Sequence, residues 1–136
     1  MFSIIMVSHA SVSSAMIDSA AMVMGKQEEL YSLDVMPEDS PDELGNRLAQ
    51  LLASAAECGD AVILSDFSLG TPFNLICGLM QRYSFCHLTG MSLPLLFNLL
   101  KNRNSSLPTD EICKDALEAA KAQMFDVNKF VKELNN

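Results

Sequence analysis

Short apolar runs that each lead into a polar residue constrain the fold of this chain more than any other feature. Phe2–Val7 leads into Ser8-His9, and Ala61–Leu64 leads into Ser65-Asp66. A strand that is apolar on both faces is typical of the buried parallel sheets of α/β proteins. We therefore expect two buried strands that carry His9 and Asp66 to the same edge of a sheet.

Helical patterns separate the apolar runs. Ser40-Pro41-Asp42-Glu43 has the signature of a helix start, with a capping serine, proline at the first helical position and glutamate three residues after the cap. Thr71-Pro72 predicts a second start of this kind, with Thr71 as the cap. The elements expected in chain order are strands near 2–9, 30–35, 60–66 and 85–89, and helices near 11–24, 40–58, 71–80, 93–101 and 109–120. Residues 124–136 fit either an edge strand or a helix.

Alternating strands and helices predict a doubly wound, mainly parallel α/β sheet with helices on both faces. The 136 residues show no linker or internal repeat, so we expect a single domain over residues 1–136. If the strand order begins 2-1-3, His9 and Asp66 end neighbouring strands where the order reverses. Ligands of such sheets gather at that point.

Composition narrows the possible functions. The chain has 9 basic and 17 acidic residues, a net charge of −8, which disfavours nucleic acid and anionic lipid as partners. Its four cysteines are widely spaced, without the CxxC pattern of zinc or redox sites. No signal peptide or membrane span is evident, and we expect a cytoplasmic protein with no metal and no cofactor.

His9 and Asp66 suggest nucleophilic chemistry. A carboxylate that accepts the Nδ1–H of an imidazole leaves Nε2 free to attack and stabilises the positive ring that results. Free backbone N–H groups at Gly70-Thr71, the Thr71 hydroxyl, and Ser11 or Ser13 are candidate phosphate-binding groups. The combination predicts phosphoryl transfer through a phosphohistidine. Each residue also has a structural interpretation, because strand-end histidines, loop-capping aspartates and helix caps are common without catalysis; His87 reads as structural.

With these motifs, the chain resembles the enzyme IIA component of the mannose family of the bacterial phosphoenolpyruvate-dependent sugar phosphotransferase system. Three features carry the resemblance: the strand that ends in Ser8-His9, the strand Val62–Asp66, and Gly70-Thr71-Pro72-Phe73-Asn74, which is similar to the family's glycine-small-proline-phenylalanine-asparagine signature. Phe67-Ser68-Leu69-Gly70 departs from the pattern, because the family has a more glycine-rich segment there. The proline- and alanine-rich linker to a fused IIB domain is also missing, which favours a stand-alone IIA chain.

The resemblance implies a phosphotransferase component (EC 2.7.1 type) that accepts phosphate from HPr on His9. Asp66 would orient the ring, and Gly70, Thr71, Ser11 and Ser13 would bind phosphate. The acceptor would be a IIB component, which serves the membrane components IIC and IID in the uptake of a hexose or amino sugar. The resemblance further implies a strand order 2-1-3-4, an antiparallel edge strand from the tail, a homodimer, and peripheral association with the membrane complex.

Three rival interpretations remain open. A phosphorelay receiver would end strand three in an aspartate, but it needs carboxylates for Mg²⁺ after strand one, where this chain has His9 and serines. A phosphotransfer subunit of a dihydroxyacetone kinase system also ends strand one in histidine; Gly70-Thr71-Pro72-Phe73-Asn74 favours the sugar system. A non-catalytic α/β interaction module is the third, since fold alone does not determine function.

Overall fold

A parallel four-stranded sheet forms the centre of the molecule in the computed structural model, which describes residues 1–136. Its strands are β1 (Ser3–His9), β2 (Leu30–Val35), β3 (Ala61–Ser65) and β4 (Cys86–Thr89), in the spatial order β2-β1-β3-β4. Every pairing is parallel. The expected doubly wound sheet and its strand order are therefore confirmed, and the order reverses between β1 and β3.

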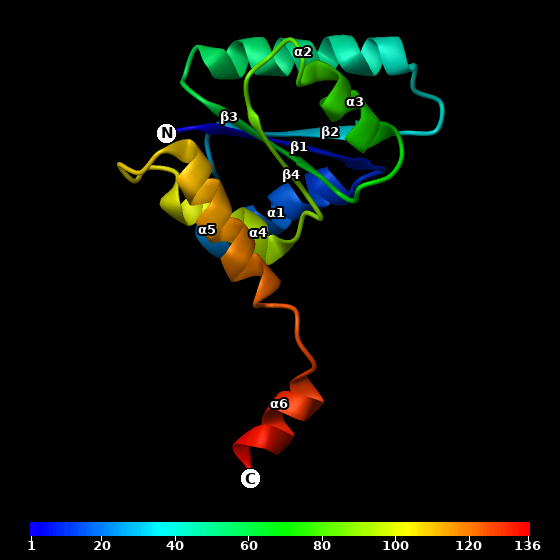
Figure 1. The fold of residues 1–136 in the computed structure, drawn as a ribbon. Helices are drawn as coiled ribbons and strands as arrows, with labels where there is room; N and C mark the ends of the chain where they lie inside the picture. Colours follow the sequence, from blue (N-terminus) through cyan, green and yellow to red (C-terminus); the bar gives the residue numbers. More distant parts are fainter.

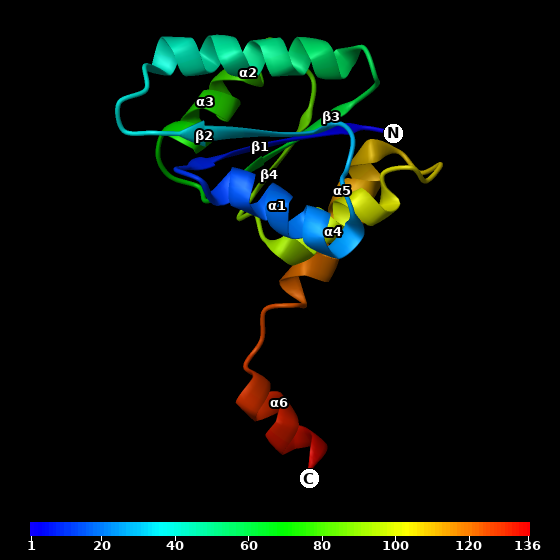
Figure 2. The same ribbon diagram turned by 180° about the vertical axis from the view of Figure 1, so that it is seen from behind.

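Helices cover both faces of the sheet (Figures 1 and 2). They are α1 (Val12–Met24), α2 (Pro41–Ala56), α3 (Thr71–Leu79), α4 (Leu93–Asn102), α5 (Thr109–Lys121) and α6 (Val127–Leu134). Figure 1 shows α2 and α3 on one face and α1, α4 and α5 on the other, while α6 projects away from both layers. None of these helices combines the length and the apolar character that crossing a bilayer requires.

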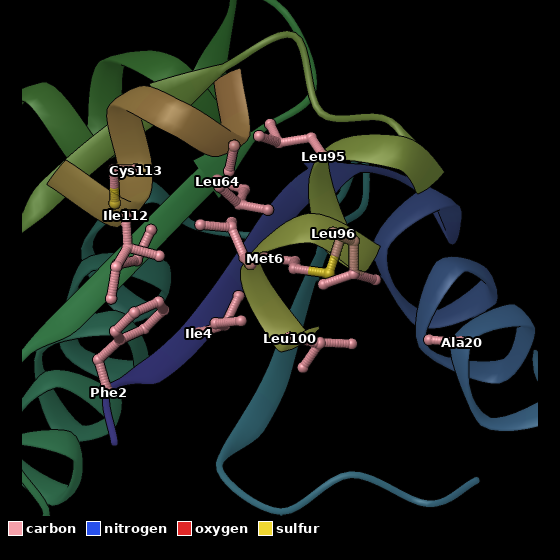
Figure 3. Close-up of a cluster of buried hydrophobic side chains, with 13 residues drawn as sticks. Phe2, Ile4, Met6, Ala20, Leu64, Leu95, Leu96, Leu100, Ile112 and Cys113 are labelled. Atoms are coloured by element: carbon pink, nitrogen blue, oxygen red, sulfur yellow. The ribbon is translucent and has the colours of Figure 1, made fainter. Parts of the chain in front are cut away.

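Strand β1 lies in both halves of the core. Ile4 and Met6 belong to the cluster shared with α1, α4 and α5, which Figure 3 shows, whereas Ile5 and Val7 belong to the cluster under α2 and α3. All four side chains are fully buried. Because successive side chains of a strand point to opposite faces, a strand covered on both sides must be apolar at nearly every position. The burial therefore explains the run that precedes His9.

Serine side chains cap the starts of α2 and α4, whereas no side chain caps the start of α3. Ser40 caps α2 by accepting the Glu43 N–H, and Ser92 caps α4 by accepting the Leu95 N–H. The prediction that Thr71 caps α3 is wrong, because Gly70 is the cap and Thr71 is the first helical residue. Gly70 has φ = 90°, a conformation that glycine adopts without steric cost and threonine does not.

The antiparallel edge strand expected from the tail is also wrong, since residues 127–134 form α6. Asp126 caps this helix by accepting the N–H of Lys129. The apolar side chains of α6, namely Val127, Phe130, Val131 and Leu134, recur at intervals of three and four residues, which places them on one helical face. A strand would need them at alternate positions, so the helical spacing decides the outcome.

Candidate functional site

His9 and Asp66 meet at the carboxyl edge of the sheet. Strands β1 and β3 are paired with Val7 opposite Ser65, so the next residues of both strands emerge side by side. Asp66 Oδ2 lies 2.8 Å from His9 Nδ1 and also accepts the His9 backbone N–H at 2.8 Å. One carboxylate oxygen therefore holds both the backbone and the ring of His9, with the Nδ1 proton directed at it.

The Asp66 carboxylate is held in its ionised form. Burial works to raise its pKa, but hydrogen bonds from the backbone N–H and ring of His9, and from the Phe67 N–H to Oδ1, outweigh burial. The pKa of Asp66 therefore lies below its ordinary value. An ionised carboxylate on Nδ1–H can stabilise the positive charge that the imidazole acquires when Nε2 forms a new bond, as in the hydrolase triad.

The opposite side of the His9 ring is open. Nε2 makes no hydrogen bond within the protein, and 45% of the side chain is exposed. The Phe67 ring packs beside the imidazole, with 5.1 Å between the ring centroids. The backbone of Gly70 passes so close to Nε2 that a β-carbon on it would clash. Nε2 is thus the accessible nucleophilic atom of the site.

A tight turn directs the chain away immediately after His9. Ala10 has φ = 50°, a left-handed conformation that is uncommon for a residue with a side chain. The turn is held from two sides: the Ala10 N–H donates to the Val35 carbonyl at 2.8 Å, and Ser8 Oγ donates to the Ala10 carbonyl at 3.1 Å. These bonds fix the backbone on which the His9 ring is mounted.

A hollow of about 260 Å³ opens beside His9. It is lined by His9, Ala10, Val35, Met36, Pro37, Asp39, Pro41 and Thr71. The backbone N–H groups of Gly70, Thr71 and Phe73 make no hydrogen bond within the protein. Together with the Thr71 side chain, these free donors lie at the positive end of α3, where Gly70 is against Nε2. A larger hollow, about 500 Å³ between Ala122 and Glu133, contains no histidine or cysteine.

Ser13 does not belong to this group of donors, although the sequence suggested it. Its hydroxyl lies 2.5 Å from Ser8 Oγ and 3.3 Å from Asp34 Oδ1, in a buried cluster behind His9. Asp34 also accepts the N–H and the hydroxyl of Ser14. The start of α1 is therefore already occupied by a carboxylate of the protein. Ser11 is exposed, and its hydroxyl makes no capping bond.

Sequence reasoning missed Asp34, Ser8 and Phe67 as residues that shape the site. Asp34 carried a signal, because it is a charged residue next to the end of a largely apolar strand. Phe67 was noticeable only as a bulky residue where smaller ones were expected. The contacts of Asp34 and Phe67 depend on which strands are neighbours, so the local sequence gives little indication of them. Ser8 instead bonds Ala10 and Ser13, which are close to it in the chain.

The chain is similar to known proteins of one family. The model of the EIIA-man family, described as the PTS system fructose IIA component, matches residues 3–117. The sorbose-specific EIIA component of the PTS from Lacticaseibacillus casei is 24% identical over 103 residues, which is 75% of this chain and 74% of the relative.

Solved structures share the fold. The phosphotransferase system component EIIA from Streptococcus agalactiae superimposes with a TM-score of 0.87 and 20% identity, over 95% of this chain and 99% of that one. The PTS IIA protein associated with the fucose utilization operon of Streptococcus pneumoniae gives a TM-score of 0.81 and 22% identity, over 96% of this chain and 99% of that one.

Proposed function

This chain belongs to the EIIA-man family and is thus a IIA phosphotransfer component of a sugar phosphotransferase system, and we propose that His9 carries its phosphoryl group. The observation that supports this role best is the hydrogen bond of 2.8 Å between His9 Nδ1 and Asp66 Oδ2, combined with an unbonded Nε2 on the open side of the ring. The whole of residues 1–136 would act as one phosphocarrier unit.

The chemical step is a displacement at phosphorus. The Nε2 lone pair forms the new N–P bond, the bond from phosphorus to its donor breaks, and that electron pair leaves with the donor. The Nδ1 proton stays in place, so the phosphorylated ring is positively charged and is stabilised by the Asp66 carboxylate. Thr71 and the free N–H groups of Gly70 and Phe73 would bind the phosphoryl oxygens. Transfer to the acceptor reverses the same movements.

The phosphoryl donor would be phospho-HPr and the acceptor a IIB component, which serves the membrane components IIC and IID in uptake of a hexose or amino sugar. The net charge of −8 supports partners with basic docking surfaces, because opposite charge accelerates encounter. Such a carrier would work in the cytoplasm, at the periphery of the membrane complex.

A homodimer is part of the proposal. Helix α6 has an exposed apolar face and projects away from the other elements (Figure 2). An isolated helix of eight residues is marginal in water, because helix formation needs more length or a packing partner. A second copy of this chain would supply a packing surface for α6.

A phosphorylation assay tests the assignment. The protein is incubated with phosphoenolpyruvate, enzyme I and HPr, and the product is analysed for an acid-labile, base-stable phosphate. The chain has only two histidines, so peptide mapping distinguishes His9 from His87. We expect phosphate on His9 and none in a folded His9→Ala variant; phosphate that persists in this variant, or its absence from the wild type, would disprove the proposal.

A further inference from the structure

The second histidine, His87, contacts two of the elements that form the site. His87 Nε2 lies 2.9 Å from Ser65 Oγ on the neighbouring strand, and Ser65 Oγ donates to Thr89 Oγ1 at 2.8 Å. The His87 ring also packs against the ring of Phe73 in the first turn of α3, with 5.3 Å between centroids. His87 is therefore in contact with both β3 and α3.

These contacts lie just outside the two ends of the loop 66–70. Ser65 immediately precedes Asp66, whose carboxylate holds Nδ1 of His9. Phe73 follows three residues after Gly70, whose backbone lies against Nε2 of His9. A shift of either end of the loop would move a group that touches the imidazole.

We infer that His87 is a positioning residue for His9, acting through its hydrogen bond to Ser65 to hold the start of the loop 66–70 in its place. His87 touches neither His9 nor the hollow beside it, so its influence is indirect. The expected effect of His87 on the rate of phosphoryl transfer rests on the proposed function. The expected effect of His87 on the tautomer of the His9 ring does not depend on that function.

The hydrogen bonds around His87 specify its tautomer. Ser65 Oγ gives its proton to Thr89, so it accepts at His87, and the proton of the imidazole must be on Nε2. Burial lowers the pKa of His87, which favours the neutral ring. A neutral imidazole with Nε2–H fits this position, and glutamine can place an N–H donor near the same point.

Four variants separate a positioning role of His87 from an effect on stability alone. His87→Phe keeps a ring for Phe73 but cannot donate to Ser65, whereas His87→Gln keeps the donor. Leu88→Ala is the matched control, because Leu88 is the next residue of β4 and packs into the cluster on the opposite face. Ser65→Ala removes the acceptor and replaces His87→Phe if that variant does not fold.

The primary measurement is the ¹⁵N spectrum of the His9 ring in the unphosphorylated protein. We expect wild type, His87→Gln and Leu88→Ala to share the signature of a single Nδ1–H form, and His87→Phe to show mixed tautomers. The rate of phosphorylation should fall by about 10-fold or more in His87→Phe, since small misplacements of a reacting group are costly. The rate should stay within about 2-fold of wild type in the other two.

The outcomes distinguish the two proposals. An unchanged His9 spectrum in His87→Phe, or in Ser65→Ala where that variant replaces it, overturns the positioning role. So does a loss of rate in Leu88→Ala that matches the loss in His87→Phe at equal stability. If the wild type accepts no phosphate at all, the proposed function fails, while the spectra alone still decide whether His87 positions the His9 ring.

Discussion

Gly70 faces the imidazole of His9 so closely that a β-carbon at this position would lie 2.7 Å from Nε2 and 3.0 Å from Cε1. Nε2 is the ring nitrogen that the bond to Asp66 leaves free. Glycine at this position therefore leaves the accessible nitrogen uncovered, and it also permits the positive φ with which the chain enters α3.

Gly70→Ala should abolish most phosphoryl transfer while the protein remains folded. The methyl group would displace the ring or cover Nε2, and we expect a rate loss of about 10²-fold or more. Gly25→Ala is the matched control, because Gly25 (φ 80°, ψ 172°) has nearly the backbone conformation of Gly70 (φ 90°, ψ −171°) with nothing within 4 Å of its β-position. Equal rate losses in both variants would assign the effect to backbone strain, which costs about 1–3 kcal/mol in such conformations.

Asp66→Asn should retain the fold and slow phosphorylation of His9 by about 10² to 10⁴-fold. The amide neither fixes the Nδ1–H tautomer nor stabilises the positive ring. Quenched time courses with phospho-HPr measure the rate of phosphorylation. Asp60→Asn serves as the control, since Asp60 bonds Thr109 at the other end of β3, far from His9. Unchanged kinetics in Asp66→Asn would make Asp66 a purely structural residue.

The stability that Asp66 contributes should depend on pH in the acid range. Its pKa is lower in the native state than the ordinary 3.8, so the unfolded state binds a proton more readily. The stabilisation by Asp66 is fully present above about pH 3.8, and it is lost as the pH falls through the pKa of Asp66 in the native state. In urea unfolding at several pH values, the difference in free energy of unfolding between wild type and Asp66→Asn should shrink as the pH falls towards 2. A difference in free energy of unfolding that does not change with pH would contradict the lowered pKa of Asp66.

Thr71→Val should lower the rate of phosphorylation, whereas Ser13→Ala should lower the stability of the protein. Thr71 lines the hollow beside His9, so loss of its hydroxyl should slow phosphorylation by about 10²-fold with little change in stability. Ser13 bonds Ser8 and Asp34, so its loss should lower the free energy of unfolding by about 1–3 kcal/mol and leave transfer near the wild-type rate. The reverse pattern would place the phosphate at the start of α1.

Phe130→Asp should convert the proposed dimer into a monomer. Phe130 lies on the apolar face of α6 and is 49% exposed in the single chain, so a charge there would oppose burial against a second copy. Asn128→Asp places the same charge on the polar side of the same helix and should leave the dimer intact. Sedimentation equilibrium measures both masses; a dimer that survives Phe130→Asp would exclude α6 as the contact.

The tail and the serines show where local sequence becomes insufficient. In the tail, Phe125 and Val127 alternate as in a strand, whereas the apolar residues of α6 have the spacing of a helix when all of them are counted. Ser11 and Ser13 occupy similar positions after β1, yet only Ser13 is buried. Its orientation towards Asp34 depends on the pairing of β1 with β2, which residues near Ser13 do not encode.

The sequence by itself determined the parallel sheet, the helices that cover it and the presence of His9 and Asp66 at strand ends. These follow from the period of apolar side chains and from burial on both faces, which are local properties of the chain. Only the tertiary structure decided which donors surround Nε2, why residue 70 is glycine, and how His87 reaches the site through Ser65. Those relationships join residues from different strands and helices, and their distances exist only after the sheet has assembled.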